Sequence, residues 1–194
     1  MQPAKMSLRV FVVALLTCLF CSKAISAEQN LAVSVSRSGE AFVVDATIDV
    51  PVTLRTAWDV LVDFDHMTSI LNNLTSSKVL SRDGNILLVM QEGVGKYGPF
   101  SYSFQSKREI RLEPMRRILA KSLSGTAKRM ESETKLLEPD QGKGVKIRYR
   151  AEIVPDSALA SMFGLPFMRH EVEEQFRLMV TEMNVREARM SADH

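Results

Sequence analysis

Six short segments that alternate between apolar and polar residues follow one another between residues 77 and 154. Turn-forming residues such as Asp83-Gly84-Asn85 and Glu113-Pro114 separate them. Such alternation is the pattern of strands with one covered and one solvated face. Because connections this short join antiparallel neighbours, we expect an antiparallel meander. The segments are Ser77–Leu80, Ile86–Glu92, Phe100–Leu112, Arg117–Ser124, Lys128–Leu137 and Val145–Val154.

Two more strands and a pair of helices precede this meander. Leu31–Val35 and Phe42–Val50 alternate on either side of a polar turn, which predicts a hairpin. Over Thr53–Phe64 the apolar residues change to helical spacing, with Thr53 as the expected N-cap. Met67–Leu74 predicts a second, short helix. We therefore expect a β-hairpin and a helical pair ahead of the meander.

A long amphipathic helix is predicted near the C-terminal end, over Phe167–Met190. Its apolar residues form one stripe, and the charged residues lie elsewhere. Because this stripe can cover the apolar face of the meander, we expect a single α+β domain over residues 28–194. The stripe comprises Met168, Val172, Phe176, Met179, Val180, Met183 and Met190.

The covered face of the predicted sheet carries a charged residue that needs an explanation. In Phe100–Leu112 the alternation places Tyr102, Phe104 and Arg108 on the same face. A guanidinium on an otherwise apolar face needs a partner. That partner can be an acidic side chain inside the domain or the polar head of a ligand. Of the two, we favour the internal acid.

The first 27 residues have the pattern of a secretory signal peptide. Lys5 and Arg9 precede the uncharged run Val10–Cys21, and small residues follow up to Ala27. The apolar run is shorter than the ~20 residues of a membrane-spanning helix, and no later stretch reaches that length. We therefore expect cleavage after Ala27 and export, with a bacterial periplasm as the compartment. An uncleaved membrane anchor is the alternative.

Removal of this segment changes the chemistry of the chain that remains. Cys18 and Cys21 both lie in it, so the mature chain has no thiol, and disulfides and cysteine-based sites are excluded. The segment also holds three of the 25 basic residues and none of the 23 acidic ones, which leaves the mature chain close to neutral. A near-neutral chain has no strong field to attract nucleic acid. We therefore expect no nucleic-acid partner.

A literal GxGxxG motif occurs at Gly93–Gly98, but its surroundings do not suit a nucleotide. The dinucleotide motif needs a helix that begins at the glycines. Here Pro99 and the predicted strand Phe100–Leu112 follow instead. We interpret the motif as a glycine-rich hairpin.

Two polar clusters were candidates for a chemical site. His170 and Glu174 can share one helix face, but two ligands do not make a metal site. Asp63, Asp65 and His66 follow the first predicted helix, where such residues usually cap the helix and contact water. We expect no metal, no cofactor and no catalytic residue from either cluster.

Five segments carry a resemblance to a known family: Ile48–Val52, Ala57–Phe64, Met67–Leu74, Arg111–Pro114 and Glu171–Met183. In their order, over about residues 41–189, the chain resembles the START-related SRPBCC superfamily, in its polyketide cyclase/dehydrase and coenzyme Q-binding branch. The resemblance implies a helix-grip fold, in which a curved antiparallel sheet wraps the long C-terminal helix and leaves a cavity. Members bind lipids, sterols, quinones or polyketides there, and some are enzymes.

The resemblance and the apolar faces together predict a non-catalytic protein that binds, carries or sequesters a hydrophobic small molecule. Pro155–Pro166, apolar for a loop, is expected to act as a gate. One alternative is a cyclase- or dehydrase-type enzyme in the same cavity, with Tyr102, Arg108, Tyr149 and His170 as candidate groups. Another is a protein-interaction module with a filled core. The residues expected to contact the ligand are Tyr102, Phe104, Arg108, Tyr149, Phe163, Phe167, Phe176 and Met179.

Overall fold

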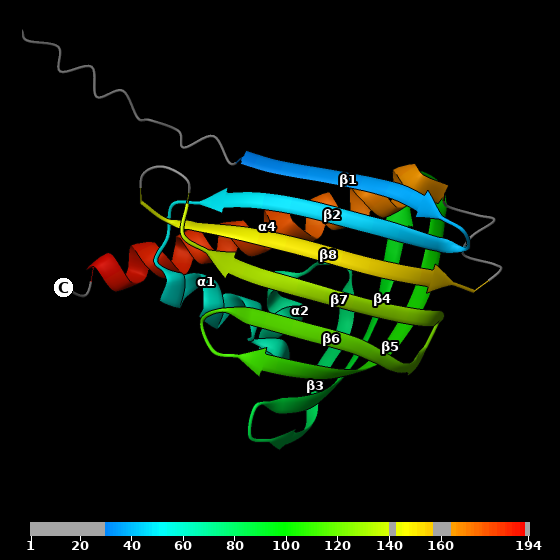
Figure 1. The fold of residues 1–194 in the computed structure, drawn as a ribbon, viewed down its shortest axis with the longest axis horizontal. Coiled ribbons are helices and arrows are strands. Elements are labelled where there is room, and N and C mark those ends of the chain that lie inside the picture. Colours follow the sequence, from blue (N-terminus) through cyan, green and yellow to red (C-terminus); the bar gives the residue numbers. More distant parts are fainter. Residues whose placement is uncertain (1–29, 140–142, 157–163, 193–194) are drawn as a thin grey trace, which may run out of the picture.

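The computed structural model describes residues 30–139, 143–156 and 164–192. Its largest element is an eight-stranded antiparallel sheet in the order β1-β2-β8-β7-β6-β5-β4-β3 (Figure 1). The meander from β3 to β8 forms in chain order, and the β1–β2 hairpin joins it through β2 and β8. Every segment predicted as a strand is a strand. The strands are β1 (Asn30–Ser38), β2 (Ala41–Val50), β3 (Leu74–Asp83), β4 (Ile86–Tyr97), β5 (Phe100–Glu113), β6 (Arg117–Gly125), β7 (Ala127–Leu137) and β8 (Val145–Pro155).

Short helical segments and one long helix lie in the described residues. The first helix begins as predicted after Thr53, whose Oγ1 accepts a hydrogen bond from the backbone N–H of Thr56 at 3.2 Å. None of the described helices has both the length and the apolar character needed to cross a membrane. The segments are α1 (Leu54–Leu61), the 3-10 helix η1 (Phe64–His66), α2 (Met67–Ile70) and α4 (Gly164–Ala192).

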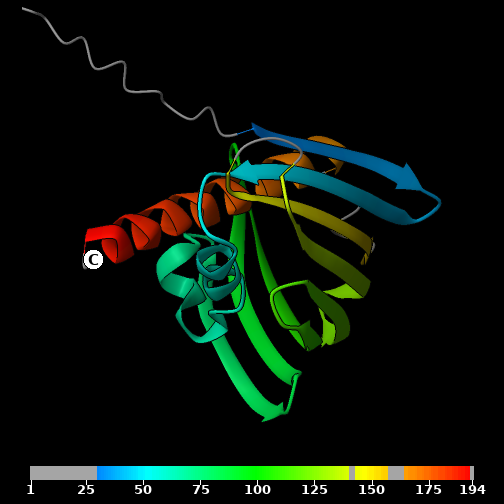
Figure 2. The same ribbon diagram turned by 60° about the vertical axis from the view of Figure 1, so that its left-hand side comes forward.

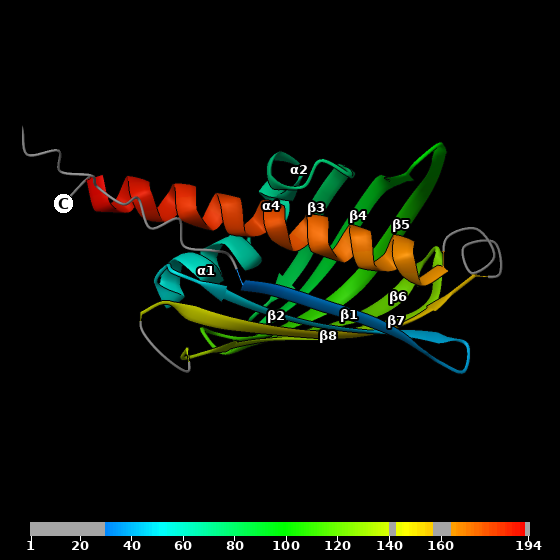
Figure 3. The same ribbon diagram turned by 90° about the horizontal axis from the view of Figure 1, so that it is seen from above.

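The sheet is strongly curved, and α4 lies along its concave side (Figure 2). Seen from above, α4 runs between the side of the sheet that holds β1, β2 and β8 and the side that holds β3, β4 and β5 (Figure 3). α1 and α2 both pack against α4. This arrangement is the helix-grip fold that the resemblance implies.

Alternation decides which side chains face α4. In β2 every second residue from Phe42 to Val50 is buried, and in β8 the buried Ile147, Ala151 and Ile153 follow the same rule. The stripe of α4 meets this face as predicted, except at its end. Met190 is 41 % exposed, because α4 extends past the edge of the sheet there (Figure 1). The buried residues of α4 are Phe167, Met168, Val172, Phe176, Val180 and Met183.

One acidic side chain joins the C-terminal half of α4 to the start of α1. Oε2 of Glu187 accepts hydrogen bonds from the hydroxyls of Thr53, at 3.0 Å, and of Thr56. Thr56 is fully buried. The N-cap of α1 and the far end of α4 are therefore held together by side chains that are more than 130 residues apart in the chain.

A second polar contact fastens the same half of α4. Arg186 donates to Oδ2 of Asp63 at 2.7 Å, and His66 donates to Oδ1 of the same carboxylate at 2.7 Å. Burial alone would raise the pKa of Asp63, but the hydrogen bonds from His66 and Arg186 and their charges hold it below its usual value. Asp65 accepts a hydrogen bond from the backbone of Val79. The acidic cluster after α1 thus takes part in packing the helical pair.

The second helix is shorter than the sequence pattern suggests. α2 ends at Ile70 rather than at Leu74. The reason is that the next residues already belong to the sheet: the carbonyl of Asn73 accepts a hydrogen bond from the N–H of Val94 at 2.8 Å, and Leu74 pairs with Gly93. As a result β3 starts at Leu74 rather than at the predicted Ser77.

Candidate functional site

An internal cavity of about 290 Å³ lies between α4 and the concave face of the sheet. Small-molecule sites usually enclose about 300–1,000 Å³, so this cavity is at the small end of that range. The cavity argues against the alternative of a protein with a filled core. Most of its wall is apolar, and part of that wall consists of Leu61, Phe64, Met67, Leu71, Ile110, Ile118, Met130 and Val172.

The structure brings the predicted ligand-contacting residues to this one cavity. β5 supplies Tyr102, Phe104 and Arg108, and β8 supplies Tyr149. They come together because inward-facing positions of a curved sheet converge on α4. From α4 come Phe167, Phe176 and Met179. Phe163, and with it most of the expected gate Pro155–Pro166, lies outside the described residues. That these side chains contact a ligand stays a prediction.

Several residues of the wall were not predicted. Leu61, Phe64 and Met67 of the helical pair line the cavity, which the helical spacing alone does not indicate. Gln91 could have been found, because Leu87, Val89 and Gln91 alternate in β4 and the first two are completely buried. Glu171 and Gln175 come from α4, on the border between its apolar stripe and its charged face.

Arg108 has a neutral partner, so the predicted internal acid is wrong. Its Nη2 donates to Oε1 of Gln91, and its Nε is buried without a partner among the described residues. The amide nitrogen of Gln91 donates to Oγ of Ser77 at 2.9 Å, and the hydroxyl of Ser77 donates to the carbonyl of Phe64. Burial lowers the pKa of Arg108, which the nearby Tyr149 partly offsets. The strand register explains the choice of partner, because Arg108 faces Val89 and reaches the next inward position, Gln91.

Tyr149 is the aromatic centre of the cavity wall. Its ring packs edge-on against Phe176, with centroids 5.2 Å apart and an angle of 65° between the planes. Its hydroxyl is hydrogen-bonded to the side chain of Ser132. Burial raises the pKa of Tyr149, and the charge of Arg108 and the bond to Ser132 only partly offset this rise. The hydroxyl therefore stays protonated at neutral pH.

The glycine motif serves close packing at one end of the cavity. β4 continues through Gly93 and Gly95, so the predicted turn begins too early. A Cβ at Gly93 would lie 2.2 Å from the carbonyl oxygen of Asn73, and one at Gly95 would lie 3.1 Å from the ring of Phe167. A strand and not a helix follows the motif. Its glycines let β4 approach α4 and the residues before β3.

A family model described as polyketide cyclase/dehydrase and lipid transport matches residues 50–178. The match spans the helical pair, the whole meander and the first half of α4, up to Leu178. The chain belongs to this family. Its narrower assignment to a coenzyme Q-binding branch stays a prediction. A search of curated proteins finds no match to the sequence.

Several solved structures share the fold of this chain. A Thermus thermophilus protein superposes with a TM-score of 0.64 at 17% identity, over 74% of this chain and 97% of that one. A STAR-related lipid transfer protein from Xanthomonas axonopodis gives 0.60 at 10% identity, over 80% and 98%. The Zhui aromatase/cyclase from a Streptomyces species gives 0.57 at 15% identity, over 77% and 94%. At these identities the likeness shows the fold alone.

His170 is exposed and is absent from the cavity wall of this family member. It was one of four candidate groups for an enzyme, and the structure separates it from Tyr102, Arg108 and Tyr149. The reason is helical spacing, because His170 lies between the inward-facing Met168 and Val172 on the opposite side of α4. Within the described ranges, no group of three His, Cys, Asp or Glu side chains could hold a metal ion.

Proposed function

We propose that this protein binds a hydrophobic small molecule in the cavity between α4 and the sheet, and carries or sequesters it without chemical change. The observation that carries the proposal is the cavity itself, a mostly apolar space between α4 and the sheet. A ligand that removes about 300 Å² of apolar surface from water gains roughly 7.5 kcal/mol at ~25 cal/mol per Å², before the costs of association. Apolar burial alone then gives useful affinity.

The polar groups in the cavity support binding rather than chemistry. Gln91 is held by Ser77, the hydroxyl of Tyr149 by Ser132, and Glu171 by Asn73, whose Nδ2 donates to it at 2.9 Å. A nucleophile needs a base within hydrogen-bonding distance. The described side chains of the wall offer fixed hydrogen bonds, which orient a ligand.

The second candidate is a cyclase- or dehydrase-type enzyme in the same cavity. The observation in its favour is that Arg108 and Tyr149 both line the cavity, since a guanidinium and a hydroxyl can together polarise a carbonyl group. The test is Tyr149→Phe assayed with a model poly-β-keto thioester. Turnover by the wild type that falls at least about 100-fold in Tyr149→Phe would favour the enzyme; no turnover by the wild type favours the carrier.

We further propose that the protein acts after export, in the bacterial periplasm, with residues 1–27 removed. The basic start, the apolar run and the small residues before Ala27 support this proposal. An exported carrier without cysteine depends on its core for stability, which agrees with the extensive buried cluster.

Native mass spectrometry on protein purified from the cell envelope, expressed with its own N-terminal segment, tests both proposals. We expect the mass of a chain that begins at residue 28, together with a bound adduct that organic solvent releases. An intact N-terminal segment contradicts cleavage after Ala27 and favours the uncleaved membrane anchor. An adduct-free mass, together with no uptake of the neutral apolar dye N-phenyl-1-naphthylamine, contradicts ligand binding.

A further inference from the structure

Arg108 brings a positive charge to the cavity wall, and no acidic side chain among the described residues neutralises this charge. No described carboxylate pairs with it, and its only hydrogen-bond partner there is the amide oxygen of Gln91. Its Nε is buried and donates to no described atom. A cation in an apolar enclosure costs free energy unless an opposite charge compensates it. The described residues of the cavity leave that charge uncompensated.

The residues behind Arg108 hold it in place without neutralising it. Because the Gln91 amide nitrogen donates to Ser77, and Ser77 donates to the carbonyl of Phe64, the Gln91 oxygen is left to face Arg108. Gln91 and Ser77 are both buried. A guanidinium has five N–H donors, and one amide oxygen satisfies only a part of them. The network therefore fixes the direction of the arginine and leaves donors for another group.

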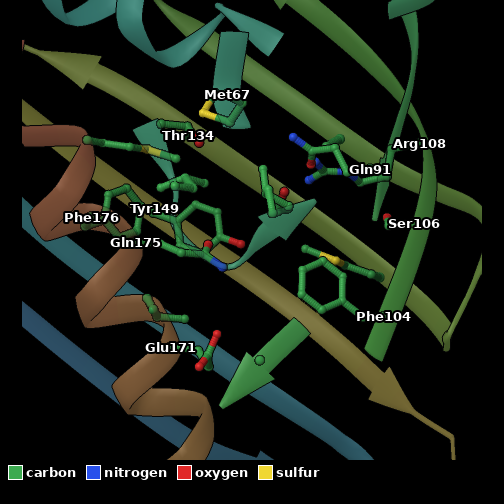
Figure 4. A pocket seen from close by; sticks show the side chains of 18 of the residues that line it. Met67, Gln91, Phe104, Ser106, Arg108, Thr134, Tyr149, Glu171, Gln175 and Phe176 are labelled. Carbon is green, nitrogen blue, oxygen red and sulfur yellow. The ribbon is translucent and has the colours of Figure 1, made fainter. Parts of the chain in front are cut away.

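The second charged side chain of the wall lies at the other end of the cavity. Glu171 comes from α4 and accepts its hydrogen bond from Asn73. In Figure 4, Arg108 and Gln91 are on one side of the pocket, Glu171 is on the other, and Tyr149 and Gln175 lie between them. A negatively charged group is therefore attracted to the Arg108 end and repelled from the Glu171 end.

We propose that the ligand is a medium-chain amphiphile with one carboxylate, which binds the guanidinium of Arg108 while the apolar chain fills the rest of the cavity. This inference rests on the proposed function. One uncompensated cation matches a single negative charge, and a planar carboxylate accepts two parallel hydrogen bonds from the guanidinium fork. A phosphate monoester would bring close to two negative charges. The volume of about 290 Å³ limits the chain to a medium length.

The test compares two ligands that differ only in the head group, decanoate and decanol, at pH 7. Each displaces the neutral dye N-phenyl-1-naphthylamine from the protein, and the fall in fluorescence gives the two dissociation constants. We expect decanoate to bind at least about tenfold more tightly than decanol, because a hydrogen bond to a charged group is stronger than one between neutral groups.

Three variants assign the preference to Arg108. Arg108→Met should remove the preference for decanoate over decanol. Arg108→Lys keeps the charge and should keep most of the preference. Gln91→Glu supplies an internal acid of nearly the same shape, so it should remove the preference while Arg108 is still present. Arg150→Met is the matched control, because Arg150 pairs with Asp45 on the outer face of the sheet.

The outcomes separate this inference from the proposed function. If the wild type takes up neither the dye nor decanol, the proposed function fails and this inference fails with it. If both neutral molecules bind but decanoate is not preferred, only this inference is wrong. Equal preference in the wild type and in Arg108→Met, with circular dichroism showing that both are folded, overturns it as well.

Discussion

Two arginines on opposite faces of the same sheet have very different surroundings. Arg150, on the outer face of β8, donates to both carboxylate oxygens of Asp45, at 2.7 and 2.9 Å, on the neighbouring strand. Arg108, on the inner face of β5, has only the neutral amide of Gln91. The alternation of the two strands places these residues on opposite faces, but it does not say which side chain each one contacts.

The comparison distinguishes two kinds of charged residue: those on the outer face, which keep the surface soluble, and those on the inner face, which belong to the candidate binding site. On the outer face, ion pairs such as Arg150 with Asp45 and Lys121 with Glu131 are solvent-exposed. Such pairs contribute little to the free energy of unfolding. On the inner face a cation is retained at a cost, since apolar residues would fill the same place more stably. A residue that lowers the stability of the fold in this way is best explained by a role in ligand binding.

The largest expected effect comes from placing a new charge on the inner face. Phe104→Asp puts a carboxylate into the cavity wall, and we expect binding of N-phenyl-1-naphthylamine to weaken by at least about 100-fold because the apolar contact is replaced by a hydrated charge. The control is Leu123→Asp, whose parent side chain is 53 % exposed. Fluorescence titration of the folded variants measures both, and equal binding by the two would contradict the cavity as the site.

Removal of the two arginines should have different effects on stability. Arg108→Met is expected to raise the free energy of unfolding by about 1–3 kcal/mol, because it removes an uncompensated charge from the interior. Arg150→Met should lower it by less than about 1 kcal/mol. Urea denaturation of the ligand-free protein measures both values. A loss of stability in Arg108→Met would show that its bond to Gln91 outweighs the cost of burial.

A third kind of charge, part-buried and paired, sharpens the comparison. Asp63→Asn should lower the free energy of unfolding by about 1.5 kcal/mol, because it breaks the contacts with Arg186 and His66. Since the pKa of Asp63 is lowered in the folded state, its contribution is present above the unfolded pKa of about 3.9 and is lost as pH falls through the folded value. Urea denaturation from pH 7 to pH 3 should show the wild type and variant converging below about pH 4. If the difference in the free energy of unfolding between wild type and variant does not change with pH, the charge of Asp63 is not its origin.

The smallest effect is expected on the outer face. Glu152→Gln removes the charge that pairs with Arg129 between β7 and β8. Because both side chains are at least half exposed, the free energy of unfolding should change by less than about 0.5 kcal/mol, and less still at high salt. Urea denaturation at low and high salt measures this. A change above 1 kcal/mol would mean that the outer charges also hold the sheet together.

The fold could be predicted because its signals are local. Alternation in β2, β5 and β8 and the helical spacing of α4 depend on the nearest neighbours in the chain, and the structure confirms them. The boundaries that failed depend on distant strands. The end of α2 is decided by the pairing of Asn73 and Leu74 with β4, and no local pattern contains that information.

For the candidate site, the sequence predicts which face of the sheet each residue occupies, but not which side chain it contacts. Alternation places Arg108, Phe104 and Tyr149 on the inner face, and the cavity wall contains all three. It does not say which side chain meets Arg108, because that depends on the register between β4 and β5. His170 shows the complementary error, since a shift of two residues along α4 moves a side chain from the inner face to solvent.

The order of the described strands has a consequence for how cavities of this kind can change size. β1 and β3 are the two edges of the sheet, so among the described strands hydrogen bonds do not close the ring. In a closed barrel, strand number and shear fix the radius, and a larger interior needs another strand. Here one helix rests across the open side, and its distance from the sheet depends on the side chains beneath it. Mutations on a single helical face can therefore resize the interior of such a protein without altering any strand pairing.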